Sequence, residues 1–171
     1  GNVYYVVLYT MLLKRRTPQN IVIGGAAGSI PPLVGWAAVT HSIGWPAAGL
    51  FAVIFLWTPP HFWALALMTE TDYDKAGIPM LPNVFGDART KRDIVLYTIV
   101  LTLASVSLWW PLHVMGALYG AAAAVLGAVF TFYAVRTLRG QSTKPARTMF
   151  LYSLLYLALM CAFMVIDRIR F

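Results

Sequence analysis

The sequence predicts an all-α protein, a polytopic bundle of transmembrane helices, from its composition and from the distribution of its charges. Of its residues, 60% are hydrophobic and only 11% are charged, whereas soluble domains carry roughly 25% charged residues. No Asp, Glu, Lys or Arg occurs in residues 17–69 or in residues 94–135. Because one membrane-spanning helix needs about 20 mostly apolar residues, each of these stretches is long enough for two helices.

The expected helices follow from the breaks in the apolar sequence. Residues 1–13 are apolar but too short to span a membrane alone, so they predict the end of a helix whose beginning precedes Gly1. Breaks at 41–46 and 109–113 divide the two uncharged stretches. The bundle then has five full spanning helices plus the end of a sixth, in a single transmembrane domain over 1–171. The expected helices cover residues 1–13, 20–40, 46–69, 93–111, 115–138 and 146–168.

Glycine and alanine residues gather at 24–28 and at 116–127. Residues of this size let helices approach closely in lipid, where larger apolar side chains gain little over contact with lipid. We interpret both clusters as packing surfaces rather than as cofactor contacts.

The basic residues predict which side of the membrane each connection faces. Eleven of the 13 lie in segments 14–16, 75–92 and 136–147, and the alternate connections carry none. The positive-inside rule places these three segments in the cytoplasm, while Asp167, Arg168 and Arg170 then lie on the opposite side, against the rule. The net charge of +7 does not indicate nucleic-acid binding, since the basic residues lie at helix ends rather than on one face.

Residues 70–93, expected as a cytoplasmic acidic and basic loop, contain five of the six acidic residues. Acidic groups at the end of membrane helices are costly unless they bind something. Glu70, Asp72 and Asp74, with basic residues close by, suit a divalent cation that carries a phosphate-bearing substrate. On a regular helix Glu70 and Asp74 share a face and Asp72 does not. An ordinary charged loop is the alternative, and composition alone favours neither.

The other candidate residues flank this segment in the sequence. Lys14 and Arg15 end the first helix, where a basic pair either binds a diphosphate or sets the topology. His61 lies within an apolar run, about 16 Å from Asp72 if the helix is continuous. An ionisable group inside a membrane indicates a functional site, but a histidine that satisfies a backbone kinked at Pro59 and Pro60 is an equal alternative. Tyr73 either binds phosphate or anchors at the interface.

Three strings then carry a resemblance to a known family: YTMLLKRRTPQNIVIGGAAGSIPPLVGWAAVT, WTPPHFWALAL and DYDKAGIPMLPNVFG. They resemble the haem-farnesylating members (protohaem IX farnesyltransferases, or haem o synthases) of the UbiA-type intramembrane prenyltransferases. The resemblance implies a nine-helix bundle, of which this chain holds the end of the fourth helix and the fifth to ninth. It also implies two acidic motifs facing each other across a cavity. Only the second, at Asp72, has a counterpart here, so we expect the 171-residue chain alone to be inactive.

The resemblance further implies the reaction and its participants. Farnesyl would pass from farnesyl diphosphate to a vinyl group of haem b, giving haem o for terminal oxidases, with Mg²⁺ on the diphosphate. The partners are the two substrates, the lipid bilayer and the missing N-terminal half. The enzyme would lie in the bacterial cytoplasmic membrane, or in the mitochondrial inner membrane of a eukaryote. The implied roles are catalysis for Asp72, Lys14 and Arg15, metal binding for Asp72, Asp74 and Glu70, and substrate binding for His61, Tyr73, Tyr9, Lys91 and Arg92.

Two other functions remain open at this point. A prenyltransferase of the quinone or chlorophyll pathways would share the magnesium chemistry, although the Pro-His and Ala-Gly-Ile-Pro-Met-Leu-Pro strings argue against it. A secondary transporter would also use acids and broken helices within the membrane. Transporter sites lie near the bilayer midplane at a repeat interface, whereas these acids lie at a helix end and no repeat is evident.

Overall fold

The computed structural model describes residues 16–169, and that part of the chain contains helices and no strand. The helices are α1 (Asn20–Gly28), α2 (Ile30–Thr40), α3 (Trp45–Ala66), α4 (Glu70–Lys75), α5 (Leu81–Phe85), α6 (Asp87–Ser107), α7 (Ala117–Arg139) and α8 (Lys144–Ile169). The prediction of an all-α bundle is therefore confirmed for the described residues. The helix expected over residues 1–13 lies outside them.

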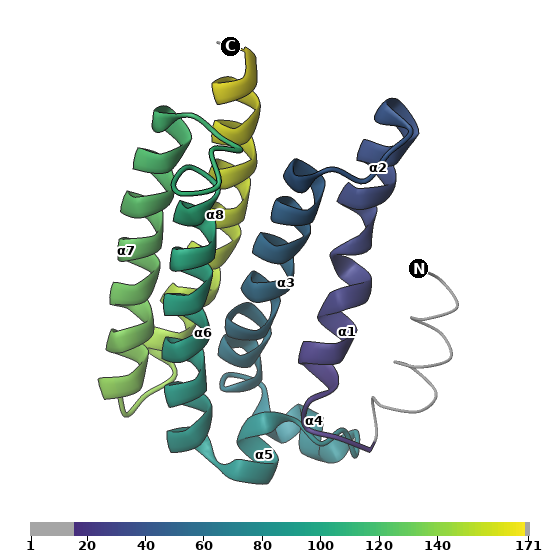
Figure 1. Ribbon diagram of the computed structural model, residues 1–171. Helices are drawn as coiled ribbons and strands as arrows, with labels where there is room; N and C mark the ends of the chain where they lie inside the picture. Colours follow the sequence, from purple (N-terminus) through teal and green to yellow (C-terminus); the bar gives the residue numbers. More distant parts are fainter. Residues whose placement is uncertain (1–15, 170–171) are drawn as a thin grey trace.

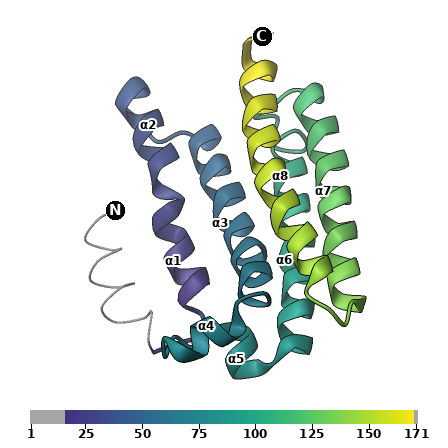
Figure 2. The same cartoon turned by 180° about the vertical axis from the view of Figure 1, so that it is seen from behind.

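The long helices run side by side, and the short α4 and α5 lie across one end of the bundle (Figure 1). α3 packs against α1, α6 and α8, and α7 packs against α6 and α8. Seen from behind, α8 lies beside α3 and α7 (Figure 2). Four spans are long and apolar enough to cross a membrane, namely Asn20–Thr40, Trp45–Ala66, Ala117–Arg139 and Lys144–Ile169. α6 also has 21 residues, but charged side chains occupy its first two turns.

Several helix boundaries differ from those expected. The helix over 20–40 is interrupted at Ser29, whose hydroxyl donates to the Gly25 carbonyl at 2.8 Å, just before two prolines that cannot donate to the turn before them. α3 ends at Ala66 rather than at 69. α6 begins at Asp87 rather than at 93. Its first turns are charged, and their acidic and basic side chains pair four residues apart, which continues the helix without apolar packing.

Residues 70–93 are consequently not a loop. They contain α4, α5 and the first turns of α6. Gly86 turns the chain between α5 and α6 with a φ of 79°, a left-handed conformation that favours glycine. The segment is thus mostly ordered into short helices, with a further left-handed turn at Gly77.

The small residues of α7 bring it close to α6 and to the connection that follows α6. A Cβ atom added at Gly120 would lie 2.4 Å from the Trp109 ring, and one added at Gly127 would lie 2.4 Å from the methyl group of Thr102. Both approaches are too close for any side chain. The interpretation of this cluster as a packing surface is therefore confirmed. In the cluster at 24–28 it holds for Gly25 of α1, where the added atom would lie 3.0 Å from Thr58, but not for Gly28, where an added atom would meet nothing within 4 Å.

The connections alternate between the two ends of the bundle as the charge pattern predicts. α4, α5 and the α7–α8 connection lie at one end, and the α2–α3 and α6–α7 connections lie at the other (Figure 1). Lys91 joins two of the basic segments, because its Nζ donates to the Gly140 carbonyl at 3.1 Å.

Asp167, the acid outside this pattern, has a structural role. Its side chain is buried near the end of α8 and accepts hydrogen bonds from the backbone N–H groups of Gly116 (2.6 Å) and Tyr119 (3.2 Å). These belong to the first turn of α7, where N–H groups lack helical partners and a negative charge is favourable. The neighbouring Arg168 donates to the Val114 carbonyl. The pair thus fastens the α6–α7 connection to α8.

We expect Asp167→Ala to lower the free energy of unfolding by about 1–3 kcal/mol, because the buried N–H of Tyr119 and the partly buried N–H of Gly116 lose their acceptor. Thermal unfolding in detergent measures the loss, with Asp87→Asn as the control because Asp87 is exposed. Equal unfolding midpoints for the two variants would contradict the capping role.

Candidate functional site

The acidic residues lie on α4, a separate helix, and not on a continuation of α3. The chain turns after Ala66, and Glu70, Asp72 and Asp74 all have exposed side chains. Tyr73 points the other way and packs, partly buried, against Ile21 and Met80. The distance of about 16 Å expected along a continuous helix therefore does not apply. His61 lies five residues before the end of α3, about 7.5 Å along its axis.

Asn83 of α5, which the sequence analysis missed, fastens this acidic helix. Its Nδ2 donates to Asp74 Oδ1 at 2.8 Å and to the Glu70 carbonyl at 3.1 Å. Its Oδ1 is buried and accepts no hydrogen bond from the described residues. A cavity of about 320 Å³ adjoins the pair; its lining comprises Asp74, Gly77, Ile78, Pro79, Asn83 and Val84. Asp74 remains exposed, but the hydrogen bond from Asn83 holds its side chain in place.

The donor set of α4 fits Mg²⁺ in part. Within residues 16–169, no three His, Cys, Asp or Glu side chains are grouped closely enough to enclose a metal ion. Mg²⁺ does not require such a cage, because it commonly takes one or two carboxylates and completes its shell with water and phosphate oxygens. The exposed carboxylates of Asp72 and Asp74 are hard oxygen donors of that kind. They suit an ion that arrives with a phosphate-bearing substrate.

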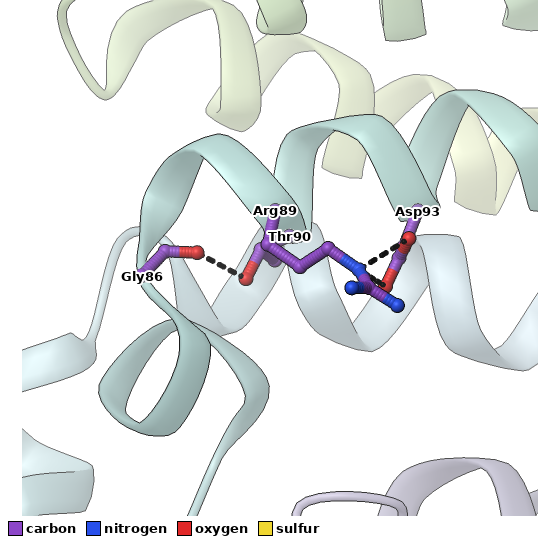
Figure 3. A network of polar contacts seen from close by, with 4 residues as sticks. All are labelled: Gly86, Arg89, Thr90 and Asp93. Carbon is purple, nitrogen blue, oxygen red and sulfur yellow. Dashed lines mark hydrogen bonds and ion pairs between the residues drawn. The ribbon is translucent and has the colours of Figure 1, made fainter.

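The basic residues of α6 differ in how they are engaged. Arg89 Nε donates to both carboxylate oxygens of Asp93 at 3.1 and 3.0 Å, and Thr90 Oγ1 donates to the Gly86 carbonyl at 3.0 Å (Figure 3). Lys91, besides its bond to Gly140, lies 3.5 Å from Asp87 Oδ2. Arg92 is exposed. Of the substrate-binding candidates on α6, Arg92 is therefore more accessible to a ligand than Lys91, which is engaged with protein groups.

The remaining candidates at this end lie outside the described residues. They are Tyr9, Lys14 and Arg15, and their predicted roles stay predictions.

His61 lies inside the bundle, 7% exposed, in a box of aromatic rings. Trp57 stacks on the imidazole with 4.3 Å between ring centroids, Phe150 stacks on it at 4.7 Å, and Phe62 meets it edge-on at 5.1 Å. Its Nδ1 lies 2.6 Å from the hydroxyl of Ser153 on α8. The histidine thus bonds a side chain of another helix, and not the backbone near Pro59 and Pro60.

An apolar groove adjoins this box between α1 and α3. Its volume is about 250 Å³, and its lining comprises Ile21, Gly24, Gly25, Gly28, Ile54, Trp57, Thr58 and Phe62. Trp57 and Phe62 therefore face both the groove and the imidazole. At Gly28 an added Cβ would meet no atom within 4 Å, so the groove has open space beside this residue. The groove can accept an apolar chain or ring beside His61.

Comparison with known proteins decides the family. The model of the UbiA prenyltransferase family matches residues 1–163. The chain belongs to the UbiA prenyltransferase family. No solved structure matches it.

Three similar proteins within this family are named as protohaem IX farnesyltransferases. The chain is 54% identical over 170 residues to the "Protoheme IX farnesyltransferase" of Trichormus variabilis, covering 99% of this chain and 54% of that protein. It is 53% identical over 170 residues to the protein of that name from Rippkaea orientalis, covering 99% and 53%. It is 52% identical to "Protoheme IX farnesyltransferase 2" of Mesorhizobium japonicum, covering 97% and 54%. The chain spans about half the length of these relatives.

For the two candidates on α6, we expect Lys91→Gln to lower the free energy of unfolding by about 1 kcal/mol, because it loses a hydrogen bond to Gly140. Arg92→Gln should change it by less than about 0.5 kcal/mol, as exposed substitutions usually do. Thermal unfolding of the two variants in the same detergent makes the comparison. A larger loss for Arg92→Gln would show that Lys91 does not tie α6 to the α7–α8 connection.

Proposed function

We propose that a full-length protein containing this chain transfers farnesyl from farnesyl diphosphate to a vinyl group of haem b, giving haem o. The observation that carries the proposal is the identity of more than half the residues, over nearly the whole chain, with proteins named for protohaem farnesylation. The membership in a prenyltransferase family supports the reaction class. The basic segments at one end of the bundle support the cytoplasmic membrane of a bacterium, with this end inside.

The diphosphate would lie at α4. Asp72 and Asp74, with Glu70 beside them, would hold Mg²⁺, which when bound neutralises phosphate charge as a Lewis acid. Their exposure leaves room for the remaining ligands to come from water and diphosphate oxygens. Lys14 and Arg15, with Arg92, would stabilise the charge that develops on the leaving diphosphate, where such groups contribute most to rate.

The bond changes follow from the two substrates. The C–O bond of farnesyl diphosphate breaks, and the diphosphate leaves with the electron pair. A haem vinyl carbon bonds to the resulting allylic cation, and water adds to the new cation with loss of a proton, giving a hydroxyethylfarnesyl group. Apolar helices around the groove would keep water from the first cation, whose premature capture would yield free farnesol.

The haem would lie deeper, near His61. The groove beside Trp57 and Phe62 offers apolar surface for a lipophilic group. A neutral imidazole is an iron ligand and a proton acceptor, and His61 stands about a turn and a half inside α3 from its α4 end.

Purified full-length protein, incubated with haem b, farnesyl diphosphate and Mg²⁺, tests the proposal. Chromatography with mass spectrometry should detect haem o, and 4-hydroxybenzoate offered in place of haem should stay unmodified. Prenylation of the hydroxybenzoate without haem o formation would assign the chain to a quinone-pathway member of the family. No transfer to either acceptor would contradict the proposed reaction.

In the same assay we expect Asp72→Asn to lower kcat about 100-fold or more, in line with the loss of several kcal/mol of transition-state charge stabilisation. The substitution keeps the size of the side chain, so haem b should bind as before. Asp87→Asn is the matched control, because Asp87 lies on α6 beyond the acidic helix; its kcat should stay within about threefold. Equal losses of kcat in the two variants would indicate that the acidic residues of α4 form an ordinary charged segment and not a metal site.

A further inference from the structure

The imidazole of His61 is restrained on most of its surface. Trp57 and Phe150 cover its two faces, with interplanar angles of 18° and 21°. Phe62 stands edge-on at 85°. The ring therefore has little freedom to turn, and its two nitrogens are held in distinct surroundings.

The hydroxyl of Ser153 determines which nitrogen carries the proton. Its oxygen lies 2.6 Å from the Phe150 carbonyl oxygen and 2.6 Å from His61 Nδ1. Two oxygens at that separation repel unless a proton lies between them, so the single hydroxyl proton goes to the carbonyl. The hydroxyl then has only lone pairs for Nδ1, and Nδ1 must itself donate. Neutral His61 is therefore the Nδ1–H tautomer.

The other nitrogen, Nε2, then carries the lone pair. None of the described residues forms a hydrogen bond with it. Histidines that bind metals commonly have this arrangement, in which the second nitrogen donates to a neighbour that fixes the tautomer and the ring orientation. Protein imidazole is also a common axial ligand of haem iron.

We propose that Ser153 is a positioning residue that holds His61 as the Nδ1–H tautomer, so that Nε2 is presented as a ligand to the haem iron. The inference rests on the proposed function, because haem b is its substrate. It assigns His61 to iron binding rather than to proton transfer at the vinyl group. Ser153 acts only through His61, and binding through Nε2 adds a bond without moving a proton.

A purely structural role for Ser153 is the competing explanation. Its backbone carbonyl accepts a hydrogen bond from Trp57 Nε1 at 2.8 Å, which ties α3 to α8. Ser153→Ala keeps this carbonyl and removes only the hydroxyl. Ser105→Ala is a matched control, since Ser105 is equally buried and its hydroxyl bonds the Tyr156 hydroxyl at 2.9 Å in the same core. Neither Ser105 nor Tyr156 contacts the imidazole through the interactions above.

The test measures binding and tautomer separately in the full-length protein. Ser153→Ala should weaken haem b binding about 10-fold to 100-fold, as loss of such supporting partners does, and shift the Soret band. The KM for farnesyl diphosphate should stay within about twofold, and Ser153→Thr, which keeps a hydroxyl, should restore the haem affinity. Ser105→Ala should leave both the affinity and the spectrum unchanged. Equal haem affinity and spectra for Ser153→Ala and Ser105→Ala would overturn the proposal.

Nitrogen-15 NMR of labelled histidine, without haem, gives the second readout. The His61 signals should show the Nδ1–H form in the parent and a mixture of tautomers in Ser153→Ala. A parent with an Nε2–H signal would overturn the proposal whatever the haem result. If the parent shows the expected tautomer but neither binds haem b nor forms haem o, the proposed function fails and the iron assignment fails with it. If the parent forms haem o and Ser153→Ala binds haem normally, only the present inference fails.

Discussion

The hydrogen bond from Trp57 to the Ser153 carbonyl is the contact on which the arrangement of the site depends. It joins residues 96 positions apart and fixes α3, which bears His61 and leads into α4, against α8. In lipid no water replaces a lost partner, so an indole N–H inside the bundle is costly unless a protein group accepts its hydrogen bond. The same turn of α8 supplies the Ser153 hydroxyl and the Phe150 ring. One interhelical tie thereby sets the position, the orientation and the hydrogen bonding of the histidine.

The two ends of the candidate site differ in charge and in exposure, as is favourable for a protein in a membrane. Carboxylates are costly within the bilayer, and Glu70, Asp72 and Asp74 lie exposed on α4, at the end of the bundle. An imidazole can stay neutral, and His61 lies inside, stacked between rings. A substrate with a charged head and an apolar acceptor would match this division. The groove between α1 and α3, which Gly28 also lines, offers apolar surface beside this histidine.

The sequence predicts most of the fold because long apolar stretches have few alternatives to spanning helices, and because glycines at 116–127 have an obvious use in helix packing. It does not predict where α6 begins, since charged residues that pair four apart continue a helix as well as apolar ones. Candidate residues such as Asp72 and His61 stand out as charged or ionisable groups in or beside apolar runs. Asn83 and Ser153 do not, and Asp167 stands out only as an exception to the charge pattern, because the importance of all three lies in partners on other helices that only the folded chain brings near.

In the proposed site, the haem lies beside α3 and the diphosphate lies at α4. In the full-length protein, Mn²⁺ can replace Mg²⁺ and bind together with a farnesyl diphosphate analogue. This ion and ferric haem then form a pair of paramagnetic centres. Relaxation enhancement between them measures their separation. A distance of roughly 10–20 Å agrees with a haem near His61, about 7.5 Å inside α3. A distance above about 30 Å, the length of a 20-residue helix, would place the haem at the opposite end of the bundle and contradict the account.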